Sequence, residues 1–234
     1  MNNIETLRKW ILESRSPVFF GGAGVSTESG IPDYRSVDGL YHQKFDYPPE
    51  TILSHDFFFR HTDYFYRFYR EKMLPIGVEP NRVHKILAKL GMTVVTQNID
   101  GLHQKAGSET VFELHGSSHR NYCRKCGKFY DGEFIAASEG IPTCDCGGLI
   151  KPDVVLYGEG LDEDVVMGAV DAIANADLLI VGGTSLTVYP AAGLLRYYNG
   201  SRLVLINKET TSMDCQADLV LHMSLGQALE EATG

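Results

Sequence analysis

The chain has 234 residues, 44% hydrophobic and 22% charged, which fits one large domain or one domain with a smaller insert and excludes disordered, collagen-like and coiled-coil chains. Lys and Arg total 21 against 30 Asp and Glu, a net charge of −9, and so acidic a chain is poorly suited to general nucleic-acid binding because phosphate contacts need cations. The balance is typical of an acidic cytosolic protein, and it would also suit a basic substrate.

Two segments and the cysteine count bear on where the protein works. Residues 1–15 mix charged and apolar side chains and lack the continuous apolar core of a signal peptide. The uncharged stretch 178–195 contains glycines and Pro190, which would interrupt a spanning helix, so it predicts a buried strand, a loop and a helix. Five cysteines are too few for a disulfide scaffold. We therefore expect a cytoplasmic protein without a membrane segment.

Apolar strands and helices alternate along most of the chain. An amphipathic helix is predicted over the first dozen residues, and the apolar run 18–20 after Pro17 predicts a buried strand. Further strands are predicted at 93–96, 111–114, 178–181 and 203–206, with helical patterns at 83–90 and 189–198. This alternation predicts an α/β fold with a doubly wound, Rossmann-like parallel sheet.

Two segments break the alternation. Residues 41–80 are rich in aromatic side chains and histidines, and residues 119–149 hold paired cysteines. We expect both to form a smaller inserted domain over one end of the sheet, made of a helical segment and a zinc ribbon. Residues 1–40, 81–118 and 150–234 would then make the larger, Rossmann-like domain.

The paired cysteines have metal-ligand spacing. Cys123-x-x-Cys126 and Cys144-x-Cys146 are separated by 17 residues, and a glycine follows each pair. Four thiolates with no fifth donor suit a closed, tetrahedral, structural Zn²⁺ site, and disulfides or unliganded thiols are the alternative. Cys215 stands alone and is expected to be a small buried hydrophobe.

A glycine-rich segment, 21–30, follows the first predicted strand. Such a turn lets backbone N–H groups approach a phosphate closely, although a turn needed only for backbone geometry remains an alternative. The third glycine of the usual dinucleotide fingerprint would fall at Thr27, and no acidic residue stands about 20 positions after the strand. A hydride-transferring dehydrogenase is therefore disfavoured.

Polar side chains follow the other predicted strands, at 96–103, 113–116, 182–186 and 206–208. Because the carboxyl ends of parallel strands share one edge of the sheet, we expect these side chains around one ligand site. An imidazole such as that of His115 is a natural general base for a sugar hydroxyl, although a lone histidine is more often structural. An Asx turn is the alternative for 96–103. The extended stretch 151–159 offers an edge for a peptide.

Together, and in this order, these motifs resemble those of the sirtuin family of NAD-dependent protein-lysine deacylases, in its bacterial type. The segment 22–35 is similar to the family's GAGxS…GIPDFR motif, with Tyr34 where phenylalanine is usual. Residues 96–100 resemble TQNID, 114–116 LHG, 154–159 VVFFGE and 183–186 GTSL, with Leu156 and Tyr157 replacing a Phe pair. The resemblance implies NAD as co-substrate, one structural Zn²⁺ on the four cysteines, and acylated-lysine proteins or peptides as substrates.

The resemblance also implies roles for single residues. His115 would be the catalytic base on a ribose hydroxyl and Asn98 a second catalytic residue, while Asp100 and Ile99 would hold the nicotinamide carboxamide. Acyl-lysine, NAD and water would give lysine, nicotinamide and O-acetyl-ADP-ribose. The NAD-binding residues would be Gly22, Ala23, Gly24, Thr27, Tyr34, Arg35, Gln97, Asn98, Ile99, Asp100, His115, Gly183, Thr184, Ser185, Asn207 and Lys208.

The acyl group is the least constrained feature. Sirtuins that prefer succinyl or malonyl lysine carry a Tyr-x-x-Arg pair, and here Tyr66 is present but Tyr69 stands in the arginine position. Arg70 is shifted by one residue, which turns its direction on a helix by about 100°. We therefore expect a deacetylase, with a desuccinylase or demalonylase as the alternative.

Two other functions remain open from the sequence. An ADP-ribosyltransferase or NAD glycohydrolase could use the same pocket and would release nicotinamide without an acyl-lysine. A zinc-ribbon binding module without catalysis would rely on the basic residues Arg120, Arg124, Lys125 and Lys128. The net charge disfavours this second function.

Overall fold

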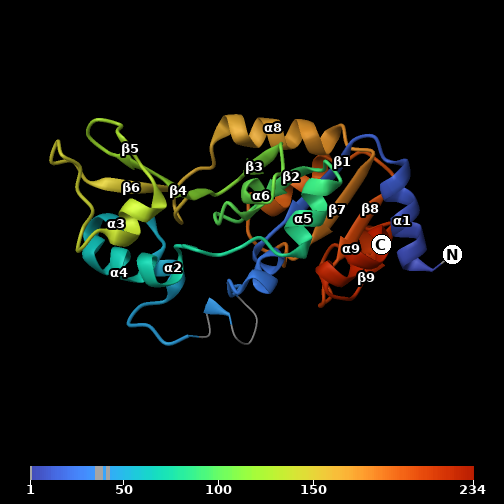
Figure 1. Cartoon of the computed structure of the whole chain (residues 1–234), viewed down its shortest axis with the longest axis horizontal. Helices are drawn as coiled ribbons and strands as arrows, with labels where there is room; N and C mark the ends of the chain where they lie inside the picture. Colours follow the sequence, from blue (N-terminus) through green and yellow to red (C-terminus); the bar gives the residue numbers. More distant parts are fainter. Residues whose placement is uncertain (1, 35–38, 41–42) are drawn as a thin grey trace.

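The computed structural model describes residues 2–34, 39–40 and 43–234, and its main element is a six-stranded parallel sheet (Figure 1). The strand order is β3-β2-β1-β7-β8-β9. The first strand, β1, lies in the middle; β2 and β3 are added on one side of it, and β7, β8 and β9 on the other. The switch point of the sheet therefore lies between β1 and β7. The strands are β1 (Pro17–Gly21), β2 (Thr93–Thr96), β3 (Val111–Glu113), β7 (Leu178–Gly182), β8 (Leu203–Ile206) and β9 (Leu219–Leu221). The predicted α/β class with a doubly wound sheet is confirmed.

Helices cover both faces of this sheet. Phe19 faces one side of β1 and Val18 and Phe20 face the other, as the two-residue period of a strand requires. One face packs against α1 (Asn3–Glu13), α5 (Arg82–Lys89) and α9 (Leu225–Thr233). The opposite face packs against α8 (Glu163–Ala174) and the 3₁₀ helix η4 (Ala191–Tyr197). The helix predicted at 189–198 is therefore a 3₁₀ helix.

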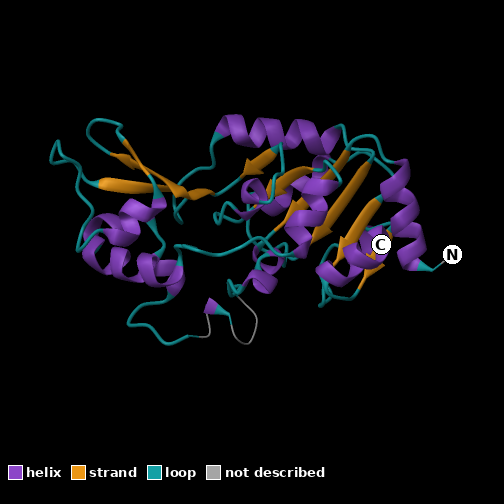
Figure 2. Ribbon diagram, in the orientation of Figure 1, coloured by secondary structure: helices purple, strands orange, loops and turns teal. Residues whose placement is uncertain are grey.

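A smaller lobe lies at the far end of the molecule from α1 (Figure 2). Its antiparallel sheet has the order β5-β4-β6, with β4 (Gly116–Cys123), β5 (Phe129–Tyr130) and β6 (Ile150–Val154). Its helices are α2 (Pro49–Ile52), α3 (His55–Arg60), α4 (Thr62–Lys72) and α7 (Gly132–Ala137).

One hydrophobic core joins the two insertions. Phe58, Phe65 and Tyr69 from the first pack with Ile135 and Ile150 in one buried cluster. Each large apolar side chain buried in this way contributes about 1.5–3 kcal/mol. The smaller sheet runs from Gly116 to Val154 and so extends beyond 119–149, and the predicted domain limits stay a prediction.

Within the described parts of the chain, no helix combines the length and the apolar character needed to cross a bilayer.

Candidate active site

A cavity of about 1030 Å³ lies at the carboxyl edge of the six-stranded sheet and reaches the smaller lobe. Leu53, Met73 and Leu156 line it from the smaller lobe. The predicted site residues that line it are Gly22, Ala23, Gly24, Thr27, Tyr34, Gln97, Asn98, Ile99, His115, Gly183, Thr184, Ser185, Asn207 and Lys208. Asp100 lines a second cavity of about 410 Å³ instead, and Arg35 lies outside the described residues.

The glycines after β1 allow two loops to touch. The N–H of Gly24 donates to the carbonyl oxygen of Gly183 over 2.8 Å. A Cβ on Gly22 would lie 2.9 Å from Cβ of Thr184, and one on Gly24 would lie 2.9 Å from the backbone of Gly183. Close packing of the two loops therefore accounts for both glycines, because neither position has room for a side chain. Their contact with a phosphate stays a prediction.

A buried network fixes the loop after β2. Asp100 Oδ2 accepts a hydrogen bond from Ser26 Oγ over 2.6 Å, and Ser26 Oγ accepts one from Asn98 Nδ2 over 3.0 Å. Asp100 Oδ1 accepts from the N–H of Leu102 over 3.0 Å, at the start of α6 (Leu102–Lys105). The Asx turn left open by the sequence is thus present.

Ser26 was missed by sequence reasoning, although it stands inside the glycine-rich motif. Both Asp100 carboxylate oxygens accept hydrogen bonds from the chain itself. The contact of Asp100 with a nicotinamide carboxamide stays a prediction. Ser26 and Asp100 are far apart in sequence, so only a family motif could have linked them.

His115 is oriented by the loop after β2. Its Nδ1 lies 2.9 Å from the carbonyl oxygen of Gln97. A carbonyl oxygen can only accept, so Nδ1 carries the hydrogen and Nε2 is the basic nitrogen. Burial lowers the pKa of His115, and the hydrogen bond to Gln97 partly offsets this. The imidazole is therefore neutral at pH 7 and able to accept a proton.

Gln97 also joins the floor of the cavity. Its Nε2 donates to Thr184 Oγ1 over 3.0 Å, and Asn207 Nδ2 donates to the carbonyl oxygen of Thr184 over 2.6 Å. These bonds connect the loops after β2, β7 and β8. The structure thus brings together residues that lie more than a hundred positions apart.

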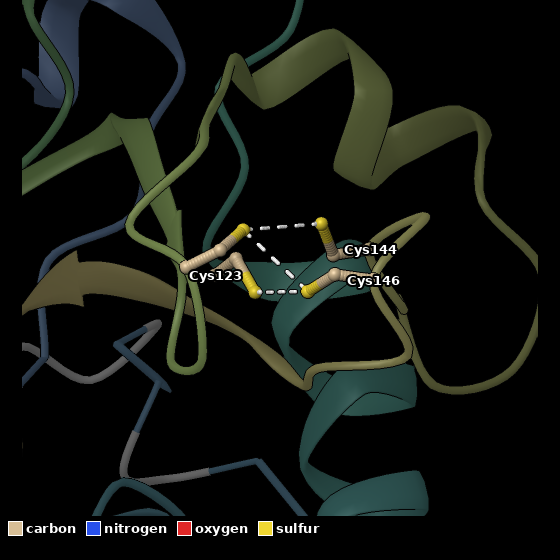
Figure 3. Close-up of side chains that lie close together, drawn as sticks. Cys123, Cys144 and Cys146 are labelled. Atoms are coloured by element: carbon tan, nitrogen blue, oxygen red, sulfur yellow. Dashed lines mark hydrogen bonds between the residues drawn. The ribbon is translucent and has the colours of Figure 1, made fainter.

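The four cysteines of the zinc ribbon converge (Figure 3). All four Sγ atoms lie within 4.8 Å of one another, and Sγ of Cys123 is 3.5 Å from that of Cys146. A disulfide needs about 2.05 Å, whereas sulfurs around tetrahedral zinc at 2.3 Å lie about 3.8 Å apart. The cluster therefore fits one zinc ion.

Glycines allow the cysteines to converge. Gly127 and Gly147 have φ of +73° and +76°, which favours glycine. A Cβ on Gly148 would lie 2.6 Å from Sγ of Cys123. Cys215 is exposed, so the expectation that it is buried is wrong. Its short 3₁₀ helix (Asp214–Gln216) turns it outward, which residue type could not indicate.

The side chains of Tyr66 and Arg70 bond to backbone carbonyl oxygens of the smaller lobe and not to groups at the large cavity. Tyr66 donates its hydroxyl hydrogen to the carbonyl oxygen of Ile150. Arg70 donates from Nε to the carbonyl oxygen of Ile135 over 2.9 Å and from Nη2 to that of Gly140 over 2.7 Å. Neither side chain lines the large cavity. The fully buried Tyr69 does not line it either.

Two residues of the predicted basic patch are paired. Arg120 Nη1 lies 2.6 Å from Glu113 Oε2, and its Nε lies 2.8 Å from Asp153 Oδ2. Lys128 Nζ lies 2.7 Å from Asp145 Oδ2. These carboxylates compete with phosphates for the two cations.

A model described as the Sir2 family matches residues 22–190. The chain is 58% identical to an NAD-dependent protein deacetylase of Clostridium acetobutylicum, covering 98% of each protein. It is 55% identical to one of Clostridium perfringens, covering 97% of each.

The chain is also similar to solved structures of Sir2 proteins. A Sir2 histidine-to-alanine variant with deacetylated p53 peptide and 3'-O-acetyl ADP ribose has a TM-score of 0.89 at 38% identity, over 97% of this chain and 96% of that one. A structure of Sir2 with p53 peptide and NAD⁺ has a TM-score of 0.84 at 39% identity, over 99% and 96%.

Proposed function

The chain belongs to the Sir2 family, and on that premise we propose that it removes acetyl groups from protein lysines with NAD as co-substrate. An acetylated protein or peptide, NAD and water give free lysine, nicotinamide and O-acetyl-ADP-ribose. The observation that carries the proposal is a neutral, oriented His115 at the strand-end cavity. Relatives named NAD-dependent protein deacetylase match nearly the whole chain.

His115 serves as the general base. Bound NAD supplies the ribose carbon that takes the acyl oxygen as nicotinamide leaves. Nε2 of His115 accepts the proton of a ribose hydroxyl, while the bond from Nδ1 to Gln97 keeps the ring in place. Asn98 supports this step by fixing Ser26 and by facing the cavity.

The remaining cavity residues hold NAD. Ala23, Thr27 and Gln97 would bind its phosphates and riboses, and Ile99 would hold the carboxamide end. Tyr34 would shield the reacting sugar carbon. The adenosine half would be held by Thr184, Ser185, Asn207 and Lys208. Asp100 also fixes the loop on which Asn98 and Ile99 stand, through Ser26 and Leu102, in addition to its predicted contact with the carboxamide.

The four cysteines hold one structural zinc ion. The cluster offers four sulfur donors and no fifth ligand among the described residues, so no position is left open for a substrate. Zinc there stabilises the smaller lobe and takes no part in the chemical step. A cytoplasmic location agrees with five cysteines that form no disulfide bond.

The acyl group is acetyl rather than succinyl or malonyl. Recognition of a succinyl or malonyl carboxylate needs a cation or phenol beside the acyl chain, and the candidate pair, Tyr66 and Arg70, bonds to backbone carbonyls of the smaller lobe instead. Leu53, Met73 and Leu156 give this side of the cavity an apolar wall. Such a wall suits a short neutral acyl chain.

Incubation with NAD and an acetyl-lysine peptide tests the proposal. Release of nicotinamide and free lysine in equal amounts supports a deacetylase. Nicotinamide released without a peptide indicates an NAD glycohydrolase instead. Nucleic-acid binding without any NAD turnover indicates a binding module.

A further inference from the structure

The segment between β6 and α8 is attached to the smaller lobe. The N–H of Tyr157 donates to the carbonyl oxygen of Leu53, and the N–H of His55 donates to the carbonyl oxygen of Tyr157, both over 2.9 Å. Together they form a bridge between Ser54 and Tyr157 of parallel type. Residues 154–159 line the large cavity. This segment therefore forms a wall of the cavity and the start of the predicted peptide edge.

The Glu159 carboxylate links this wall to neighbouring elements by hydrogen bonds. Its Oε1 accepts a hydrogen bond from His55 Nδ1 over 2.9 Å. Its Oε2 accepts from the N–H of Leu156 over 2.9 Å and from Lys151 Nζ over 3.0 Å. One carboxylate thus joins the first turn of α3, the strand β6 and the segment's own backbone.

The environment of Glu159 favours its charged form. Burial raises the pKa of the carboxyl, but hydrogen bonds from Leu156, His55 and Lys151 outweigh it, so the pKa lies below its ordinary value. The side chain of Lys151 is only 12% exposed and that of Glu159 20%. Hydrogen bonds to a partly buried charge are stronger than neutral ones.

We propose that Glu159, with His55 as its partner, is a positioning residue that holds the segment 155–159 in shape for the acyl-lysine peptide. The inference rests on the proposed function, because it takes this segment as the peptide's edge. A loose segment would have to be ordered when the peptide binds, which weakens its affinity. The residues proposed to hold NAD stand outside the segment 155–159, so NAD binding should depend far less on this wall.

Kinetics with each substrate varied in turn test the proposal. In Glu159→Gln an amide N–H₂ replaces one acceptor oxygen beside the donors of His55 and Lys151. We expect the KM for an acetyl-lysine peptide to rise about tenfold, the equivalent of about 1.4 kcal/mol. The KM for NAD and kcat should change much less. Glu139→Gln, at an exposed site that does not line the large cavity, is the matched control and should behave as the wild type.

His55→Phe is the second variant. It keeps an aromatic ring beside Phe59, whose centroid lies 4.8 Å from that of His55, and removes only the donor to Glu159. Because the His55 side chain is 47% exposed, this variant should fold even if Glu159→Gln does not. A peptide KM that rises about threefold supports the proposal, as expected for one lost exposed bond.

Two outcomes would overturn the inference: an unchanged peptide KM in His55→Phe, or equal rises in the KM values for peptide and NAD. Anisotropy of a labelled acetyl-lysine peptide should show the same loss of affinity without turnover. Wild-type protein that binds the peptide but releases no lysine would refute the proposed function. The positioning role of Glu159 could still be tested, by the anisotropy of the labelled peptide.

Discussion

The imidazole of His115 donates its Nδ1 hydrogen to the carbonyl oxygen of Gln97 over 2.9 Å, which joins the turn between β3 and β4 to the loop after β2. This bond selects the tautomer, and burial lowers the pKa of the ring. A base with a lowered pKa stays neutral further into the acid range. The acid limb of kcat/KM assigned to His115 should therefore lie below pH 6.5.

His115→Ala should fold and bind NAD but turn over about 10²–10⁴-fold more slowly, because a general base contributes roughly that factor. Single-turnover release of nicotinamide and lysine measures the loss, and calorimetric titration with NAD measures the binding. Near-normal deacetylation by this variant would show that another group takes the proton.

Cys126→Ser should lose zinc and thermal stability together, because metal affinity and folding are coupled at a structural site. Metal content by atomic emission and Tm by calorimetry are the two readouts. Cys215→Ser is the control, since this exposed thiol lies outside the cluster. A Cys126→Ser protein without zinc but with wild-type Tm and activity would contradict a structural role.

Acetyl and succinyl versions of one peptide should differ in kcat/KM, with acetyl preferred. Arg70→Met should leave that ratio unchanged, because Arg70 bonds to the carbonyl oxygens of Ile135 and Gly140 rather than facing the cavity. It should lower stability by about 1–3 kcal/mol, the cost of leaving such carbonyls unpaired. A succinyl preference that disappears in Arg70→Met would reverse the acyl assignment.

The loss of folding stability at acid pH should come in part from His84 and His103. Both are buried, their ring centroids are 4.7 Å apart, and neither ring nitrogen of His103 has a hydrogen-bond partner among the described residues. Burial lowers the pKa of His84 to about 4 and that of His103 to about 3. Between these values and 6.5 the unfolded chain binds more protons, so stability falls as pH falls.

Each such histidine contributes up to about 1.4 kcal/mol per pH unit. His103→Leu loses no hydrogen bond and should keep its stability at pH 7. Its free energy of unfolding in urea should decline less steeply than that of the wild type from pH 6 to pH 4. Parallel declines for the two proteins would show that His103 does not titrate on unfolding.

Local pattern was enough for much of the fold. Apolar runs predicted β1, β2, β3, β7 and β8, because strands buried on both faces are apolar throughout. β9, which is as short as β3, was missed. The edge of the sheet where the large cavity lies was predictable from the polar side chains that follow the predicted parallel strands. The zinc cluster was predictable from spacing.

Contacts between distant residues could not be read in this way. Ser26 and Asp100 bond across 74 positions, and Arg70 finds its carbonyls 65 and 70 residues away. Residue type and spacing give no distance between such positions. The expectation for Cys215 failed because the small size of a side chain does not determine its burial.

The strand order of the six-stranded sheet determines when each strand can pair with its neighbours during synthesis. Pro17 of β1 pairs with Leu178 of β7, which the ribosome makes about 160 residues later, and such distant contacts form slowly. The four cysteines lie within residues 123–146, so the ribbon can bind its metal soon after it leaves the exit tunnel. The nascent chain must therefore keep β1 from aggregating until its partner emerges. A protein made without zinc would reach that point with a less stable smaller lobe.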